Sequence, residues 1–478
     1  MKATAQLPKG RIPMESGLSV GALRYDTDMP AAPAHQAHRL ANARRDGLLL
    51  FVLGALIFVL LGLALERAAA APGEDFRALY YPAKTLLAGA DPYNAGDLLN
   101  VLRADGPKFG NDAWKLEQIA TRSIYPPTAY TFVLPFALLP WRLAQPAWLA
   151  LTILSLVGAC VLVWRVCAQS APLLAGSLLA LLLINSELIV IANNSAGIVV
   201  SLCVVAVYCF LYQRYPWLGV LCLAASVSIK PHETGLVWIY FLLAGGVYRK
   251  RAVQTLLVAV LLALPCLAWV FARAPHWLGE WQSNIAFLAA PGGISDPGPH
   301  SLGGHGLAMV ISLQALLSYF WDDPRFYNLG SYVLTAPLLL VWILVTVHTR
   351  ATRERAWLAI ASITLISLLP VYHRQYDARM LLLTIPGCVV LCTQLPHFGG
   401  MTKLVTAGAI LFTGDLLWAI LLALLSMAPQ PATPRAQWFH AAVEMLPAPL
   451  VLLLAAIFFL WAYWRFAAVQ DADAQLPA

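Results

Sequence analysis

The sequence predicts an all-α protein that crosses a membrane many times. Of its 478 residues, 60% are hydrophobic and only 12% are charged, and the mean hydropathy is +0.70. In soluble proteins about a quarter of the residues are charged. Apolar stretches of about 20 residues, each enough to cross roughly 30 Å of hydrocarbon as a helix, recur along the chain. We therefore expect one bundle of transmembrane helices rather than about three soluble domains.

The excess of positive charge agrees with a membrane protein. The formal net charge is +7 and the pI is about 9.0. The basic residues stand mostly in short clusters between apolar segments, which is the pattern that orients membrane helices. We expect the lipid bilayer, and no nucleic acid, as the partner of this charge.

The cysteines are expected to be small buried side chains. All eight lie in or at the ends of apolar runs, away from the long polar loops where disulfides would form. Cys388 and Cys392 are four residues apart, which suits a metal pair only if other soft ligands converge, and none is evident nearby. No bound metal or cofactor is expected.

Three regions are predicted along the chain. Residues 1–46 form a polar tail that is rich in lysine and arginine and should remain in the cytoplasm. Residues 47–467 form the transmembrane domain, which begins with a signal anchor at 47–66. Residues 468–478 form a second cytoplasmic tail.

Two long connections are expected on the outer, periplasmic side. The signal anchor delivers residues 67–126 to that side. The basic clusters at 249–251 and 350–355 both favour the cytoplasm, so residues 273–328 return to the outside. The short apolar piece near 305–320 should then lie on the membrane surface.

Thirteen apolar runs are candidates for membrane spans. They lie at 47–66, 127–140, 146–165, 171–191, 197–213, 216–230, 233–248, 252–272, 329–347, 355–372, 379–396, 402–426 and 446–464. Because both termini are expected inside, the number of spans must be even. One short run between 127 and 248 should therefore fail to cross, and we expect twelve spans in an inner membrane.

Asp75 is the first polar residue of interest, because ionisable groups near a membrane face are costly and persist mainly for a reason. It follows the first span by a few residues, on the outer side. A carboxylate there could act as a general base on an acceptor hydroxyl. The alternative is an interfacial loop in which Asp75 pairs with Arg77. Tyr81 follows shortly after and suits the headgroup level.

Lys230 lies in a polar break between two short apolar segments. Pro231 opens the next helix, so the lysine and the free backbone N–H groups at the helix start offer a site for an anion such as phosphate. The alternative is that Lys230 extends along apolar surface toward water. His232 and Glu233 make the break more polar than that alternative requires.

The segment 372–379 carries a third polar group on the same side as Asp75. His373 and Asp377 are four residues apart and would share one face of a helical turn. Arg374 and Arg379 can donate two hydrogen bonds each to a phosphate. An imidazole oriented by a carboxylate can bind or protonate a leaving phosphate. The alternative is an ordinary charged turn between helices.

Several common chemistries lack their motifs. The chain has no Walker loop, no GxGxxG, no GxSxG, no CxxC and no HExxH. Nucleotide-driven transport, hydride transfer and zinc hydrolysis are therefore not indicated. A transporter or flippase of lipid-linked sugars is the main alternative to an enzyme, but we see no paired halves, and the ionisable residues gather at one face rather than at the midplane. A noncatalytic scaffold would leave this clustering unexplained.

The order of these motifs resembles a known family. An acidic DF motif and a YY pair follow the first span, and GADPY, IYPP, SIKP and YHRQYD come later in that order. Over roughly residues 47–400 this pattern is similar to the polyprenol-phosphate-mannose-dependent glycosyltransferases of family 87, which have the GT-C fold. Members usually carry a GQ pair near residue 197, whereas this chain has Asn193 and Asn194 before that point and either amide could substitute.

The resemblance implies roles for the residues in these motifs. Asp75 would be the catalytic base, and the loop 67–126 would cover a periplasmic active site. Lys230, His373 and Arg374 would bind the phosphate of the donor. The supporting residues would be Arg77, Tyr81, His232, Asp377 and Arg379.

The predicted function is transfer of a sugar from a polyprenyl phosphate to a hydroxyl of a lipid or cell-envelope glycan. A membrane enzyme without nucleotide motifs needs a donor that arrives through the lipid, and such a donor has an anionic leaving group. Mannose is the default sugar that the resemblance implies. A single base without a second nucleophilic carboxylate favours inversion at the anomeric carbon.

Overall fold

The computed structural model describes residues 34–69, 72–105, 117, 119–301, 309–427 and 433–473. Most of the predicted tail 1–46, the end of the predicted tail 468–478 and part of the loop 67–126 lie outside the described residues. Residues Ala43–Ala478 form one compact unit, and this unit contains the whole candidate site.

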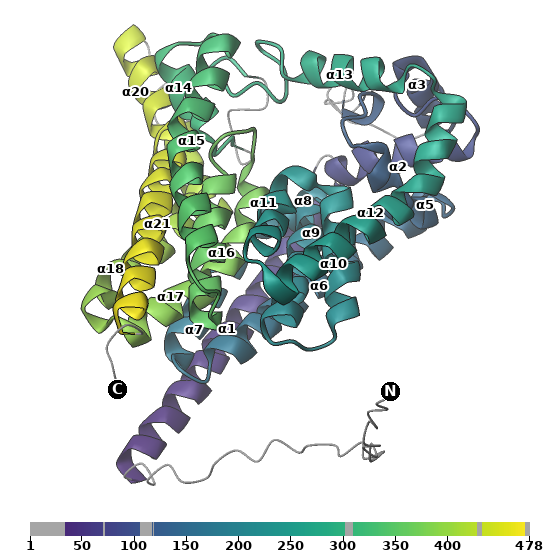
Figure 1. The fold of residues 1–478 in the computed structure, drawn as a ribbon. Helices are drawn as coiled ribbons and strands as arrows, with labels where there is room; N and C mark the ends of the chain where they lie inside the picture. The colour runs from purple at the N-terminus through teal and green to yellow at the C-terminus, as the bar shows by residue number, and fades with distance from the viewer. Residues whose placement is uncertain are drawn as a thin grey trace, which may run out of the picture. The chain divides into compact units, whose positions relative to one another are not determined.

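The described chain is helical, as the sequence predicts. Within these segments there is no strand, and Val310 pairs with Arg374 in an isolated bridge. The helices, drawn in Figure 1, are α1 (Ala34–Ala68), α2 (Glu74–Leu87), α3 (Ala95–Ala104), α5 (Pro127–Ala137), α6 (Trp141–Cys167), α7 (Pro172–Ile184), α8 (Glu187–Ala192), α9 (Ala196–Leu211), α10 (Pro216–Ile229), α11 (Pro231–Leu243), α12 (Gly246–Arg273), α13 (Trp277–Leu288), α14 (Leu313–Phe320), α15 (Pro324–His348), α16 (Arg353–Ser367), η1 (Gln375–Leu383), α17 (Thr384–Gln394), η2 (Pro396–Phe398), α18 (Gly399–Phe412), α19 (Asp415–Met427), α20 (Pro434–Met445) and α21 (Pro447–Asp473).

Six helical stretches of the described chain are long and apolar enough to cross a membrane, and a seventh is possible if α18 and α19, which meet at a 57° bend, form one span. The six are α1, α6, α12, α15, α21 and the continuous stretch η1–α17. Each predicted apolar run coincides with helical structure, but breaks such as Lys230–Pro231 leave several helices too short to span alone. Multiple membrane crossing is supported, and the expected number of twelve is not.

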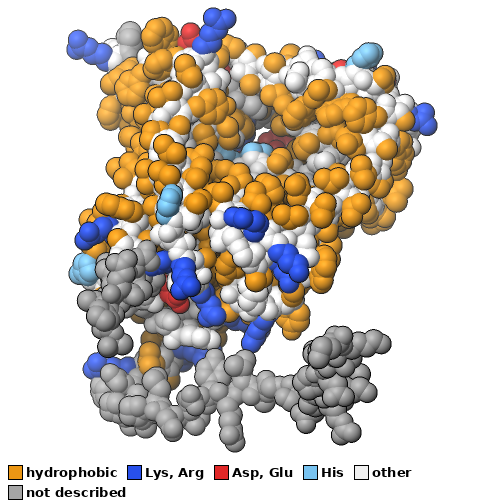
Figure 2. Space-filling view, viewed as in Figure 1, with side chains coloured by type: hydrophobic (Ala, Val, Ile, Leu, Met, Phe, Trp, Pro, Cys, Tyr) orange, Lys and Arg blue, Asp and Glu red, His pale blue; other side chains and the backbone are white. Residues whose placement is uncertain are grey.

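The surface of the protein is largely apolar. Figure 2 shows hydrophobic side chains over most of the visible face, with lysine and arginine concentrated toward its lower and upper edges. Large apolar residues point outward along the long helices, as Leu60 on α1, Leu261 on α12 and Leu340 on α15 do. Such exposure is expected of helices that face lipid.

Two hydrophobic clusters organise the interior. The larger one joins α6, α7, α9, α10, α16, α17 and α21. The smaller one joins α2, α3 and α5 to parts of α6 and α12. Phe76 of α2 is central to the smaller cluster, because its ring stacks on Trp148 with centroids 4.7 Å apart and on Trp141 at 5.5 Å. The described part of the loop 67–126 is therefore packed helical structure.

The described part of the second outer connection is packed against other helices. The piece near 305–320 was expected to lie on the membrane surface, and its first part lies outside the described residues. The helix α14 that follows is mostly buried, because it packs between α15, α20 and α21. Helix α13, by contrast, runs across the top of Figure 1 between this group and the group formed by α2, α3 and α5.

Candidate active site

Asp75 is held at the first turn of α2 by the local backbone. Gly73 precedes the helix with a positive φ of 72°, and a Cβ there would lie 3.3 Å from the Asn193 side-chain amide. The N–H of Gly73 donates to the carbonyl of Ile191 at 3.0 Å. Glycine is thus needed where α2 meets the end of α8, and this contact aims Asp75 at the turn that follows α8.

Asn194 is the direct partner of Asp75. Its Nδ2 donates to Asp75 Oδ2 at 2.7 Å, although 119 residues separate the two in sequence. Its Oδ1 accepts from the backbone N–H of Ala196 at 2.7 Å, which fixes the amide at the start of α9. The same oxygen accepts from Lys230 Nζ at 3.1 Å. One amide therefore connects the candidate base to the candidate phosphate ligand.

Lys230 is buried among oxygen atoms at the break between α10 and α11. Its Nζ donates to Glu233 Oε1 at 2.6 Å and to Asp377 Oδ1 at 2.9 Å, besides Asn194. The side chain is only 5% exposed. These contacts do not agree with an extended lysine that reaches for bulk water.

Asp377 connects this break to η1. Its Oδ2 accepts from the backbone N–H of Arg374 at 2.9 Å and lies 3.4 Å from His373 Nδ1. The expected proximity of His373 and Asp377 is therefore present. The His373 ring is fully buried, and its centroid lies 5.3 Å from that of His232.

Arg374 faces the second outer connection. Its Nη2 donates to the carbonyl of Ile294 at 2.6 Å, and its Nε contacts the Tyr372 hydroxyl. The backbone N–H of Ile311 donates to the carbonyl of His373 at 2.9 Å. The residues around His373 thus anchor the connection between α13 and α14 over the site.

Burial and charge together set the protonation of the groups outside the membrane spans. Burial raises the pKa of the Asp75 carboxyl above its ordinary value, although the Asn194 hydrogen bond and the cations Arg374 and Lys230 act in the opposite direction. Burial likewise raises the pKa of Tyr125 to about 12, so this phenol stays neutral beside the cluster. A carboxyl with a raised pKa accepts a proton more readily than an ordinary aspartate, which suits a general base.

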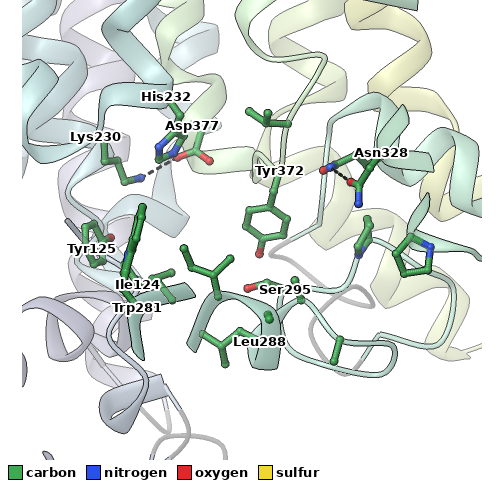
Figure 3. Close-up of a pocket in the computed structure, with 18 of the residues that line it drawn as sticks. Ile124, Tyr125, Lys230, His232, Trp281, Leu288, Ser295, Asn328, Tyr372 and Asp377 are labelled. Carbon is green, nitrogen blue, oxygen red and sulfur yellow. Dashed lines mark hydrogen bonds and ion pairs between the residues drawn. The ribbon is translucent and has the colours of Figure 1, made fainter. Parts of the chain in front are cut away.

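A cavity of about 720 Å³ borders this cluster. Its walls are mostly apolar, and its polar side chains include Lys230, His232 and Asp377. Figure 3 shows these three together on one wall, with Tyr372 projecting into the cavity. The other residues drawn or lining include Ile124, Tyr125, Ile229, Trp281, Ile285, Leu288, Tyr327, Val371 and Tyr376.

The remaining predicted residues lie elsewhere. Three of them do not line the cavity: Asp75, His373 and Arg374. His373 and Arg374 contact Asp377, which lines the cavity, and Asp75 contacts Asn194 in the same cluster. Arg77 lies over the Trp141 ring at 4.2 Å and Tyr81 stacks on that ring at 6.1 Å, so both help to pack α2.

Arg379 is directed away from the cavity. Its guanidinium donates to backbone carbonyls of Asn185, Thr413 and Gln375 and to the Ser186 hydroxyl. The structure therefore separates Arg379 from the residues predicted to bind phosphate.

Two residues of the site were not predicted from the sequence. Glu233 was noted only as polarity at the break, yet it is fully buried and pairs with Lys230. Trp281 was not singled out at all, although it lines the cavity and its Nε1 donates to the carbonyl of Ile124 at 2.8 Å. For Glu233 the signal was a carboxylate three residues after a lysine at a helix start. No local signal marks Trp281.

Metal binding has no arrangement to support it in the described residues. Among them, no group of three or more His, Cys, Asp or Glu side chains is placed to hold an ion. Cys388 and Cys392 donate weakly to backbone carbonyls of Thr402 and Gly399, at 3.9 and 3.6 Å.

Comparison with known proteins identifies the family. The model of glycosyltransferase family 87 matches residues 124–372, slightly more than half of the chain. No curated protein sequence and no solved structure gives a significant match. The matched segment includes Asn194 and Lys230, whereas Asp75 precedes it and Asp377 follows it. The chain belongs to glycosyltransferase family 87 and is a membrane glycosyltransferase.

Proposed function

We propose that this protein transfers a sugar from a polyprenyl phosphate to a hydroxyl group of a lipid or cell-envelope glycan. The observation that carries the proposal is the hydrogen-bonded series Asp75–Asn194–Lys230–Asp377, which ends on the wall of a large apolar cavity. This series connects a candidate base to a candidate anion ligand through a single amide.

The chemistry of the cavity favours a lipid-linked donor. Ile124, Ile229 and Leu288 offer apolar surface to a polyprenyl chain, whereas Lys230 offers a fixed positive charge and His232 a ring nitrogen to a phosphate. A nucleotide sugar would need polar contacts for its base and ribose. The sugar itself is a default, mannose, which follows from the resemblance and from nothing in the cavity.

The proposed reaction is a single displacement at the anomeric carbon. The acceptor oxygen attacks that carbon, its proton passes to Asp75, and the bond from the carbon to the phosphate oxygen breaks. The electron pair of that bond remains on the phosphate. The anomeric configuration is inverted, because the attacking and leaving oxygens occupy opposite faces.

Lys230 has the main electrostatic role in this proposal. Charge builds up on the phosphate as the sugar departs, and a preorganised cation stabilises it more in the transition state than in the ground state. Asp377 and Glu233 hold the ammonium in place. His373 and Arg374 act indirectly. Both contact Asp377, and neither lines the cavity.

The location of the reaction is part of the same proposal. We place the active site at the periplasmic face of the inner membrane and both termini in the cytoplasm, as the basic clusters indicate. The donor is a substrate and no separate cofactor takes part. Treatment with EDTA should accordingly leave the rate of transfer within about twofold of the untreated enzyme.

A donor panel tests the proposal directly. Purified protein in lipid nanodiscs would be given polyprenyl phosphate sugars and the corresponding nucleotide sugars, with a glycolipid acceptor. We expect transfer from at least one lipid-linked donor, with an inverted linkage by NMR, and none from nucleotide sugars. Transfer from nucleotide sugars alone would contradict the proposed donor class.

A further inference from the structure

A second cleft lies beside the apolar cavity and shares no residue with it. Its volume is about 290 Å³. The residues that line it are mostly polar: Tyr93, Asn94, Ala95, Gly96, Arg122, Glu280, Ser283 and Asn284. Asn94, Gly96 and Ser283 are exposed, so the cleft opens to solvent. The family match begins at residue 124, so the first five of these residues precede it.

Helix α13 separates the two cavities. Glu280, Ser283 and Asn284 line the polar cleft, whereas Trp281 and Ile285 line the apolar cavity. Residues three or four apart share a helix face, so the sequence of α13 presents a polar face to one side and an apolar face to the other.

Two hydrogen bonds fix the helix in this position. Asn284 Nδ2 donates to the carbonyl of Tyr93 at 3.0 Å, and Trp281 Nε1 donates to the carbonyl of Ile124 at 2.8 Å.

The polar cleft offers both donors and acceptors of hydrogen bonds. Arg122 lies over the Phe287 ring at 4.4 Å, and its Nη1 lies 3.4 Å from Asn284 Oδ1, a long contact that leaves other guanidinium N–H groups for a ligand. The Oε2 atom of Glu280 is buried and makes no hydrogen bond of good geometry within the described residues, although Asp91 and Asn94 lie close enough to affect the pKa of this carboxyl. An acceptor without a partner is costly, and a ligand hydroxyl would satisfy it.

The cleft is connected to the candidate base through aromatic residues. The Tyr93 hydroxyl donates to the carbonyl of Tyr125 at 2.8 Å, and the Tyr125 hydroxyl lies 3.5 Å from Ser195 Oγ. Ser195 follows Asn194, the partner of Asp75. Tyr93 also belongs to the same hydrophobic cluster as the buried residues of α2. A molecule in the cleft would therefore lie on the α2 side of α13, away from the donor cavity.

We infer that this cleft binds the carbohydrate part of the acceptor. Sugar rings carry many hydroxyl groups, which need the mixture of carboxylate, guanidinium, amide and hydroxyl groups found here. A volume of about 290 Å³ lies near the lower limit of roughly 300 Å³ for small-molecule sites, and so suits a short saccharide better than a lipid chain. The inference rests on the proposed function only in identifying this saccharide as the acceptor.

Four substitutions on α13 test this assignment. Ser283→Trp fills the polar cleft, Gln282→Trp adds the same side chain at an exposed neighbour that lines neither cavity, and Ala286→Trp projects into the apolar cavity. Glu280→Gln is a milder change that removes the charge without filling the cleft. Saturation-transfer NMR with short oligosaccharides of mannose, and in parallel of glucose, measures binding to the purified variants.

We expect at least one oligosaccharide to bind the parent protein and Gln282→Trp alike. Ser283→Trp should weaken that binding about tenfold or more, because the indole occupies the cleft and the ligand loses hydrogen bonds to the groups that line it. Glu280→Gln should weaken it in the same direction. Ala286→Trp should keep oligosaccharide binding and lose donor binding. No binding to the parent, or equal binding to the parent, Ser283→Trp and Glu280→Gln, would overturn the inference.

A transfer assay links the cleft to the reaction. With an acceptor that carries several sugars, Ser283→Trp should raise KM about tenfold, whereas an acceptor of one sugar should be used almost equally by Ser283→Trp and Gln282→Trp. Equal KM values for the long acceptor would contradict the inference. If the parent transfers no sugar from any polyprenyl phosphate, the proposed function fails, and the NMR measurement still decides whether the cleft binds carbohydrate.

Discussion

Two buried charge clusters meet on η1 and differ in what they face. In the first, Lys230 pairs with Glu233 and Asp377 and borders the apolar cavity of about 720 Å³. In the second, Arg379 donates to backbone carbonyls of Asn185 and Thr413. Asp377 and Arg379 are only two residues apart, yet each belongs to a different cluster.

The partners of each cation explain the difference. Lys230 is surrounded by side-chain oxygens that hold it beside a cavity, so its charge remains near a space that a ligand can fill. The guanidinium of Arg379 donates hydrogen bonds to carbonyl groups at helix ends, which have no partner within their own helix. Glu187 and Asp415, which lie near Arg379, border a cavity of only about 60 Å³. The two buried cations therefore differ in that Lys230 borders a ligand-sized space and Arg379 does not.

Of the two clusters, the first should show the larger effect on activity, at Lys230. Lys230→Met should lower the rate of transfer about a hundredfold per folded molecule and weaken donor binding, because the phosphate loses its cation. The protein should also be less stable, since Glu233 and Asp377 remain buried without a counter-charge. The rate is measured with a lipid-linked sugar donor, and the folded fraction by size-exclusion chromatography in detergent.

Lys403 provides the matched control for this change. It is an exposed lysine on α18, so Lys403→Met should keep the rate within about twofold. Equal rates for the two variants would show that Lys230 is structural, like Arg379.

The opposite pattern is expected at Arg379. Arg379→Met should lower the free energy of unfolding by about 3 kcal/mol or more, because several buried carbonyls lose their donor. The rate per folded molecule should stay within about threefold of the parent. Arg379→Lys should lose less stability, since it keeps the charge but not the planar set of donors. Thermal unfolding in detergent gives the stability, and a hundredfold loss of rate with normal stability would contradict the distinction between the clusters.

The sequence predicts which residues form the first cluster better than it predicts the contacts between them. Lys230 before a proline and His373 four residues before Asp377 are local patterns, and both indicate sites that the structure brings together. The hydrogen bond between Asp75 and Asn194 spans 119 residues, so no local pattern could select Asn194 over Asn193.

Arg379 shows a second limit of the sequence. The segment after Arg374 was treated as an α-helical turn, but it forms the 3₁₀ helix η1, in which each residue turns about 120° rather than 100°. Asp377 and Arg379 are two residues apart, so their side chains point to different sides of η1 and reach different clusters. The predicted number of twelve spans stays a prediction, because polar breaks that the apolar runs do not show divide several of them into helices too short to span alone.

A smaller effect, on the pH dependence, is expected at Asn194. Asn194→Asp keeps the oxygen that accepts from Ala196 and Lys230, but it replaces the donor to Asp75 by a second carboxylate. Both changes raise the pKa of Asp75, which burial already raises. Because the base must be deprotonated, the rising limb of kcat/KM against pH should move to higher pH.

Asn193→Asp is the matched control for this shift. Asn193 lies next to Asn194 but donates to the carbonyl of Val190 instead of to Asp75, and its positive φ of 52° is tolerated by aspartate. Its pH profile should move less than that of Asn194→Asp. An identical pH profile for the parent and Asn194→Asp would show that Asn194 does not affect the pKa of the base.

The role of Asp75 as the base is the central claim, and Asp75→Asn tests it most directly. Asparagine keeps the shape of the side chain but cannot take up the proton that the hydroxyl group of the acceptor loses. Donor binding and single-turnover transfer would be measured for Asp75→Asn, with Glu74→Gln on the same helix turn as the control. We expect donor binding within about twofold of the parent and a loss of transfer of at least about a hundredfold, with Glu74→Gln close to the parent. Transfer by Asp75→Asn at the parental rate would contradict it.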